Sequence, residues 1–166
     1  MLLPDVATAM LVSLNSQNDI AFLGPALFQL NKFVSGASKK KHFLYKFEFC
    51  PNWNTFCKNG LGSVHAAELA YVFGGDRFGN YNYTSQDVAV SDMMMEMWTN
   101  FAKTGDPTAT VPVGGTAWRP YTSGSHNYLL IGNKTESKIW PTPAVPKAFD
   151  VYLQKLEGVQ GPVVVG

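Results

Sequence analysis

The clearest pattern of alternating hydrophobic and polar positions lies in the second half of the chain. After residue 84, apolar side chains recur at helical spacing, in the order Val90, Met94, Met97, Trp98 and Phe101. Thr84 or Ser85 is suited to cap the first turn of this helix, and the Gly-Asp-Pro sequence at 105–107 predicts its end. The methionines of this stripe, at positions 93, 94, 95 and 97, are interpreted as core packing rather than as a metal or cofactor site.

Four other stretches carry shorter helical patterns. Residues 4–14 and 25–35 are apolar at helical spacing, and each has a proline suited to a first turn. Between them, Asn18-Asp19 predicts a turn, and Gly36 predicts the end of the second helix. A short helical segment is expected over 66–73, and a last amphipathic helix over 145–157.

One stretch alternates with the two-residue period of a strand. In residues 42–49, four aromatic side chains share one face: Phe43, Tyr45, Phe47 and Phe49. A loop follows to residue 62, and shorter strands are expected at 118–121, 128–131 and 138–140. Helices that alternate with strands in this order predict an α/β fold, and residues 1–166 are interpreted as part of one such domain.

Composition narrows the possible functions. Charged residues make up 15% of the chain and the formal net charge is +1, so the sequence predicts no nucleic-acid partner, because no strongly basic face can be built. The basic run at 39–41 is interpreted as a solvated loop. No stretch reaches the roughly 18 apolar residues that span a bilayer. The sequence predicts no cofactor and no particular oligomeric state.

The two cysteines suggest a compartment. Cys50 and Cys57 flank a short polar stretch, and the region lacks the further Cys or His residues of a metal site. A local disulfide in a secreted or lumenal protein is the favoured interpretation, with two free thiols as the alternative. Sequons for N-glycosylation at Asn82 and Asn133 indicate the same compartment, although the first residues make a poor signal peptide.

Three histidines are the candidates for a catalytic base. His42 begins the strand and His126 lies in a Ser/Gly loop, and both are interpreted as ordinary surface residues. His65 follows a strand and a long glycine-rich loop, which is where α/β folds place catalytic groups. His65 and Glu68 have no second such pair in the sequence, so no metal site is predicted. The sequence also contains no GxSxG motif and no phosphate-binding glycine loop.

The segment LGSVHAAELAYVFGG around His65 resembles the histidine segment of the type-B carboxylesterases, which include cholinesterases and fungal lipases. Downstream, MMMEMWTNFAKTGDPT, AWRPYT and YLLIG are similar to that family's Trp-x-x-Phe-Ala helix, its Gly-Asp-Pro turn and the strand that follows. Upstream, NDIAFLGPALFQLNKF and FLYKFEF resemble its Asp-x-x-Phe helix and its aromatic strand. The resemblance covers residues 15–132 in the family's order.

The resemblance implies an α/β-hydrolase fold and a Ser-His-acid triad that cleaves carboxylic esters. It assigns the triad base to His65 and a structural hydrogen-bonding role to Glu68, while Ala66 stands where the family usually has Gly. In this family the serine and the acid precede the histidine. The nucleophile, the acid and the oxyanion hole are therefore expected before residue 1, and the chain is expected to be a C-terminal portion, inactive alone. The alternative is a non-catalytic, esterase-like binding or adhesion module.

Overall fold

The computed structural model describes residues 19–36, 40–75, 81–108 and 112–140, together with Phe149, Tyr152, Leu153 and Lys155. The chain divides into two compact units, of which one is Lys39–Trp140 and the other joins Met1–Ser38 to Pro141–Gly166. The helix predicted over 4–14 lies outside the described residues, as does that over 145–157 apart from the four single residues just named. Across the part of the chain that is described, no helix is long and apolar enough to cross a membrane.

The described residues of the unit that holds the N-terminal segment include a helix of 12 residues. A π-helical turn, η1 (Asp19–Leu23), leads directly into α2 (Gly24–Ser35). Pro25 lies at the start of α2 and Gly36 follows its end, so the predicted helix is confirmed. Where the sequence predicts a turn at 18–19, Asp19 instead begins η1, and Asn18 lies outside the described residues.

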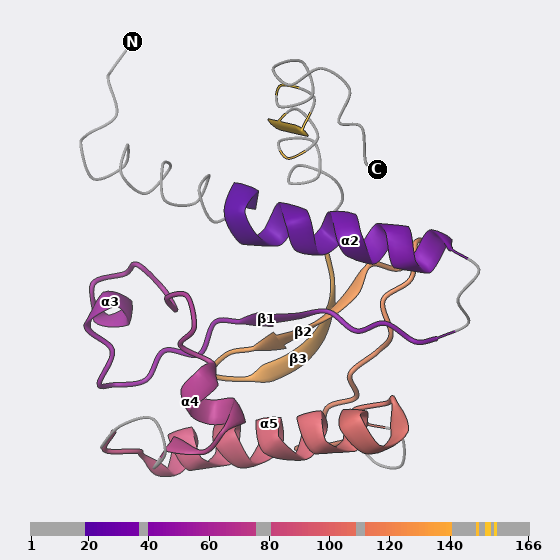
Figure 1. The fold of residues 1–166 in the computed structure, drawn as a ribbon. Helices are drawn as coiled ribbons and strands as arrows, with labels where there is room; N and C mark the ends of the chain where they lie inside the picture. The colour runs from indigo at the N-terminus through magenta and orange to yellow at the C-terminus, as the bar shows by residue number, and fades with distance from the viewer. Residues whose placement is uncertain are drawn as a thin grey trace. The chain divides into compact units, whose positions relative to one another are not determined.

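A mixed three-stranded sheet forms the centre of unit Lys39–Trp140, as Figure 1 shows. Its strands are β1 (Tyr45–Phe47), β2 (Asn127–Ile131) and β3 (Thr135–Ile139), in the order β1-β2-β3. β1 pairs with β2 in parallel and β2 with β3 antiparallel. The helices and this sheet confirm an α/β arrangement.

Three of the four predicted strands form, with changed lengths, and the one predicted over 118–121 does not. β1 covers only the middle of the predicted strand, and Trp118–Tyr121 contributes a single bridge, between His42 and Tyr121, instead of a strand. β3 begins at Thr135, before the predicted residues 138–140. The predicted alternation still holds, because Phe49 is buried and Phe43, Tyr45 and Phe47 pack against the same core.

The long helix α5 (Ser85–Thr104) lies along one face of the sheet (Figure 1). Thr84 and Asp87 form a reciprocal capping box at its start, and Gly105, with φ of 75°, closes its end in the left-handed conformation. Val90, Met94 and Met97 are buried, which confirms the predicted stripe and its role in packing. Phe101 departs from the prediction. It is 47% exposed, and its ring meets the Phe43 ring edge to face.

Aromatic rings fill the space between β1 and α5. Tyr45 meets Trp98 edge to face, with ring centroids 5.0 Å apart, and Trp118 contacts both rings. The indole Nε1–H of Trp118 donates to the Leu44 carbonyl oxygen at 2.9 Å, so this large side chain is buried with its one polar group satisfied. These contacts hold the sheet on α5.

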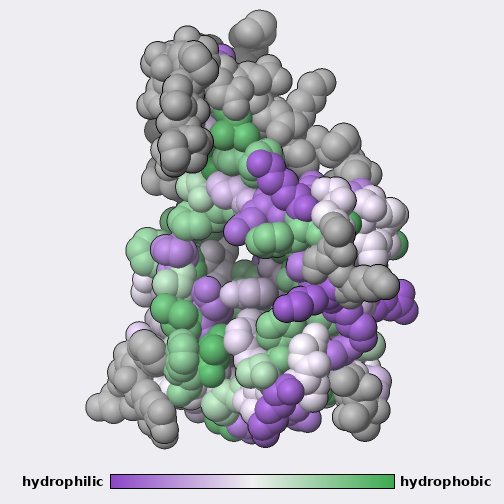
Figure 2. All heavy atoms as spheres, turned by 45° about the vertical axis from the view of Figure 1, so that its right-hand side comes forward, coloured by the Kyte–Doolittle hydropathy of each residue, from purple (hydrophilic) through white to green (hydrophobic). Residues whose placement is uncertain are grey.

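Two short helices connect β1 to α5. They are α3 (Thr55–Lys58), within the loop predicted to be irregular, and α4 (Leu69–Val72), which is shorter than the segment predicted over 66–73. Large hydrophobic side chains remain exposed in this unit, among them Phe56, Phe73 and Ile139. The face drawn in Figure 2 accordingly mixes hydrophobic with hydrophilic residues.

Candidate active site around His65

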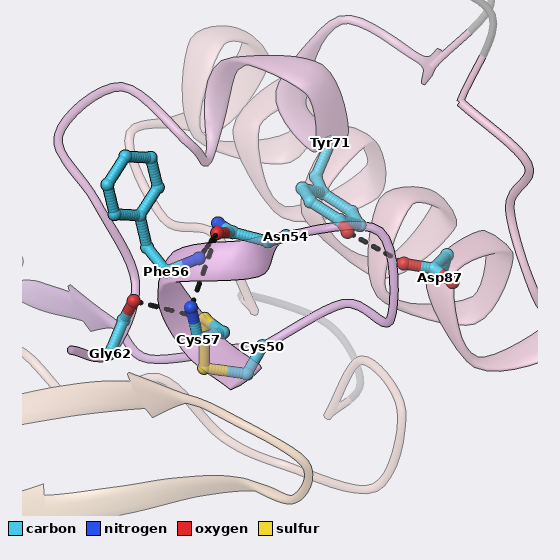
Figure 3. Close-up of a disulfide and its surroundings, with 7 residues drawn as sticks. All are labelled: Cys50, Asn54, Phe56, Cys57, Gly62, Tyr71 and Asp87. Carbon is cyan, nitrogen blue, oxygen red and sulfur yellow. Dashed lines mark hydrogen bonds between the residues drawn. A yellow bond between two sulfur atoms is a disulfide. The ribbon is translucent and has the colours of Figure 1, made fainter. Parts of the chain in front are cut away.

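The loop that precedes His65 is closed by a disulfide. Cys50 and Cys57 are bonded, with Cα atoms 5.5 Å apart, which confirms the predicted local disulfide (Figure 3). Cys57 Sγ also lies 3.1 Å from the Gly62 carbonyl oxygen. Because a disulfide sulfur carries no proton, this is a close contact and not a hydrogen bond. The disulfide thus links two positions that are seven residues apart, just before the histidine segment.

Asn54 shapes the interior of this loop. Its Oδ1 accepts hydrogen bonds from the backbone N–H groups of Phe56 and Cys57, at 3.0 and 3.3 Å, and so caps α3 (Figure 3). The Asn54 side chain is only 5% exposed, so the cap satisfies a polar group that is otherwise buried. The sequence analysis missed this residue, although Asn at a helix start is a recognised signal.

His65 lies in the turn that leads into α4, and its side chain is exposed. The Ala67 N–H donates to the Val64 carbonyl at 3.1 Å, and the Leu69 N–H donates to the Ala66 carbonyl at 3.2 Å. Within this turn Ala66 has a φ of 65°, in the left-handed region that favours glycine. This conformation gives a physical reason for the glycine that the family usually has after the histidine.

Glu68 is directed toward β1. Burial raises the pKa of the Tyr45 hydroxyl, and the nearby charge of the Glu68 carboxylate and a hydrogen bond to it raise it further. Tyr45 belongs to the aromatic core under the sheet. The Glu68 carboxylate thus lies near a side chain of that core, and this supports a structural role for Glu68.

α4 is attached to α5 through a buried carboxylate. The Tyr71 hydroxyl donates to Asp87 Oδ1 at 2.7 Å (Figure 3). The Ser91 hydroxyl donates to the Tyr71 carbonyl at 2.8 Å. Burial of Tyr71 is the main cause that raises the pKa of this tyrosine far above its ordinary range, and its hydrogen bond to Asp87 is the second cause. The Asp87 carboxylate also completes the capping box with Thr84. The residues after His65 are therefore tied to α5, the longest helix among the described residues.

A pocket of about 250 Å³ opens beside His65. Trp53 and Tyr81 form one wall, and their rings stack with centroids 4.3 Å apart and planes 23° from parallel. The rest of the lining is small or apolar except for one amide and the histidine: Asn54, Val64, His65, Ala66, Ala67, Leu69 and Ala70. No spacing in the sequence connects Trp53 with Tyr81, so sequence reasoning missed both.

The other histidines lie elsewhere in the same unit. His42 bridges to Tyr121 through its backbone, and the His126 ring meets the Tyr121 ring edge-on, with centroids 5.5 Å apart. Neither histidine lines the pocket beside His65. Asn82 and Asn133, the residues of the two sequons, are both exposed. Among the described residues, no group of three or more His, Cys, Asp or Glu side chains is arranged to hold a metal ion.

The helices and the mixed sheet define an α/β protein whose histidine turn borders a small pocket. Comparison with known sequences identifies its family. Residues 6–146 match the Carboxylesterase family. The bile salt-activated lipases of Rattus norvegicus and Homo sapiens are 37% and 36% identical over 121 residues, which is 73% of this chain. The acetylcholinesterase of Gallus gallus is 38% identical over 78 residues, or 47% of the chain.

The chain belongs to the carboxylesterase family, and the predicted resemblance is confirmed. The α/β-hydrolase fold is inferred from this membership. The matched region amounts to 20% of the rat lipase, 16% of the human lipase and 9% of the chicken acetylcholinesterase, so the chain spans a small part of the length of these relatives.

Proposed function

We propose that this chain carries the general base, His65, of a serine hydrolase that cleaves carboxylic esters. The observation that supports this most directly is the position of His65. Its side chain is exposed at the edge of a pocket, and it lies in the segment that resembles the family's histidine segment. Histidine suits the task because its unperturbed pKa lies near neutral pH, where it can accept and return a proton.

In the proposed reaction His65 takes the proton of a serine hydroxyl as that oxygen attacks the ester carbonyl carbon. It then returns the proton to the leaving alcohol as the carbon–oxygen bond breaks, and a water repeats the cycle to release the acid. Glu68 does not serve as the triad acid in this proposal, because its neighbour is the Tyr45 hydroxyl. We assign it to the support of the turn.

The nucleophile belongs to other residues of the complete enzyme in this proposal. The sequence contains no GxSxG motif, which in this family presents the serine on a sharp turn between a strand and a helix. A histidine alone supplies neither the attacking oxygen nor the oxyanion donors, and the three work as a unit. We therefore propose that the 166 residues alone are inactive toward esters.

The test compares histidine variants in the complete hydrolase that contains this chain. His65→Ala is expected to lower kcat for 4-nitrophenyl acetate by about 10³-fold or more, in line with the loss of a triad base. His42→Ala and His126→Ala are matched controls, because both residues lie away from the pocket, and both are expected to be nearly silent.

Two outcomes would contradict the proposal. Hydrolysis that survives His65→Ala in the complete protein would show that a group other than His65 acts as the base. Turnover by the 166 residues alone, lost when one of their own serines is replaced, would require a nucleophile outside the GxSxG pattern.

We also propose that the protein is a secreted or lumenal glycoprotein. The Cys50–Cys57 disulfide supports an oxidising compartment. Asn82 and Asn133 are both exposed, so both side chains are accessible for glycan attachment.

A further inference from the structure

We propose that the pocket beside His65 binds an uncharged single ring, as the aryl group of an ester substrate. This inference rests on the proposed function for its substrate class. The pocket itself comes from the geometry of Trp53, Tyr81 and the turn after the disulfide loop.

The shape of the pocket wall favours a flat group. The Trp53 and Tyr81 rings lie 23° from parallel, and Tyr83 continues the series at 19° to Tyr81. Tyr83 is held in turn, because its hydroxyl donates to the Ala70 carbonyl at 3.0 Å and its ring lies 11° from parallel with that of Tyr71. Because Trp53 and Tyr83 stack against Tyr81, Tyr81 offers its ring edge to a guest, and the face of a flat ring can meet that edge in the T-shaped arrangement that aromatic pairs favour.

The lining favours an uncharged group. None of the described side chains that line the pocket is a carboxylate, an ammonium or a guanidinium, so no charged group among them can pair with a charged ligand. Val64, Leu69 and three alanines supply the remaining apolar contacts. These residues suit the hydrocarbon part of an ester, with His65 at its edge.

The volume favours a small group. A dry cavity of roughly 150 Å³ accommodates benzene, whereas pockets for drug-sized ligands start at roughly 300 Å³. At about 250 Å³ the pocket has room for one substituted ring. A long fatty acyl chain would leave most of its length outside.

The test measures binding without turnover, on the whole 166-residue chain. Phenylacetone is the probe, because this ketone has the shape of phenyl acetate but no ester bond to cleave. The indole N–H signals of the four tryptophans are followed by ¹H–¹⁵N NMR, with Trp53→Phe identifying one signal and Trp140→Phe serving as the control assignment. The Trp53 signal is expected to shift saturably, and the Trp140 signal to stay in place.

Two comparison ligands and two variants define specificity. The cation 4-oxopentyltrimethylammonium and the long ketone 2-undecanone are each expected to bind at least about fivefold more weakly. Tyr81→Ala should weaken phenylacetone binding by about fivefold, or about 1 kcal/mol, because it removes an aromatic ring from the pocket wall. Tyr81→Phe keeps the ring and is expected to bind like the wild type, so it separates the loss of the ring contact from the loss of the hydroxyl group.

Equal binding of the cation, an equal shift of all four indole signals, or a Tyr81→Ala variant that binds normally would each overturn the inference. Because the titration involves no catalysis, its failure leaves the His65 test unaffected. Conversely, ring binding by a protein in which His65→Ala leaves kcat unchanged would keep the pocket and reject His65 as the general base.

Discussion

At the scale of single residues, Ala66 has an unfavourable backbone conformation within the histidine turn. Among the described residues only Ala66 and His126 are non-glycine residues with positive φ. A left-handed L-residue costs roughly 1–2 kcal/mol, because Cβ approaches the following carbonyl oxygen. Ala66 adopts this conformation while the two backbone hydrogen bonds of the turn form. The surrounding structure therefore determines the shape of the turn.

Ala66→Gly is expected to raise the free energy of unfolding by about 0.5–1 kcal/mol. Relief of the left-handed strain outweighs the extra backbone entropy that glycine gains in the unfolded chain. Urea unfolding measures the difference. Ala67→Gly is the matched control, since Ala67 is buried and does not have a positive φ, and it should lower stability. A lower stability for Ala66→Gly would show that the turn is not strained.

At the scale of elements, the histidine turn is held by contacts on two sides. The disulfide and the α3 cap hold the loop before it, and the Tyr71–Asp87 hydrogen bond ties α4, after it, to α5. Gly75, just beyond α4, lies so close to the Tyr83 ring that any Cβ there would collide with it. These contacts leave the short helices little freedom, although helices of this length have no stability of their own.

The double change Cys50→Ser/Cys57→Ser is expected to lower the free energy of unfolding by about 2.5 kcal/mol, because it releases a closed loop of this length in the unfolded chain. Denaturant unfolding of the oxidised wild type and the variant measures this loss. Non-reducing peptide mass spectrometry should show one linked Cys50–Cys57 species. Equal stability of the two proteins, or free thiols in oxidised material, would contradict a stabilising role.

At the scale of the whole molecule, the two sequons predict where the proposed glycoprotein is modified. Asn82 lies just before the α5 cap, and Asn133 lies in the turn between β2 and β3. Translation with endoplasmic-reticulum microsomes, behind an added secretory signal, should attach a glycan at each site. Asn82→Gln and Asn133→Gln should each remove one, as glycosidase treatment and mass spectrometry reveal.

Asn52→Gln is the control, because Asn52 is exposed but lies outside any sequon. Replacing the asparagines rather than Thr84 matters, since Thr84 caps α5 and its loss would disturb the helix itself. Protein that enters the microsomes without any glycosidase-sensitive mass would reject the glycoprotein proposal.

The sequence alone determined the elements that depend on local pattern. The stripe at Val90, Met94 and Met97, the glycine at 105 and the capping residue Thr84 define α5 within the chain itself. The alternating aromatic residues of β1, the cysteine pair and the family's ordered motifs were also readable, because each is a matter of residue type and spacing.

Only the tertiary structure decided which distant residues meet. It shortened β1, because a strand extends only as far as a partner pairs with it, and it replaced the strand expected at 118–121 with one bridge. It also placed Tyr81 against Trp53 at the edge of the histidine turn, across 28 positions that carry no shared period. Contacts of this kind form when separate elements pack, so they depend on the whole arrangement and on no local pattern.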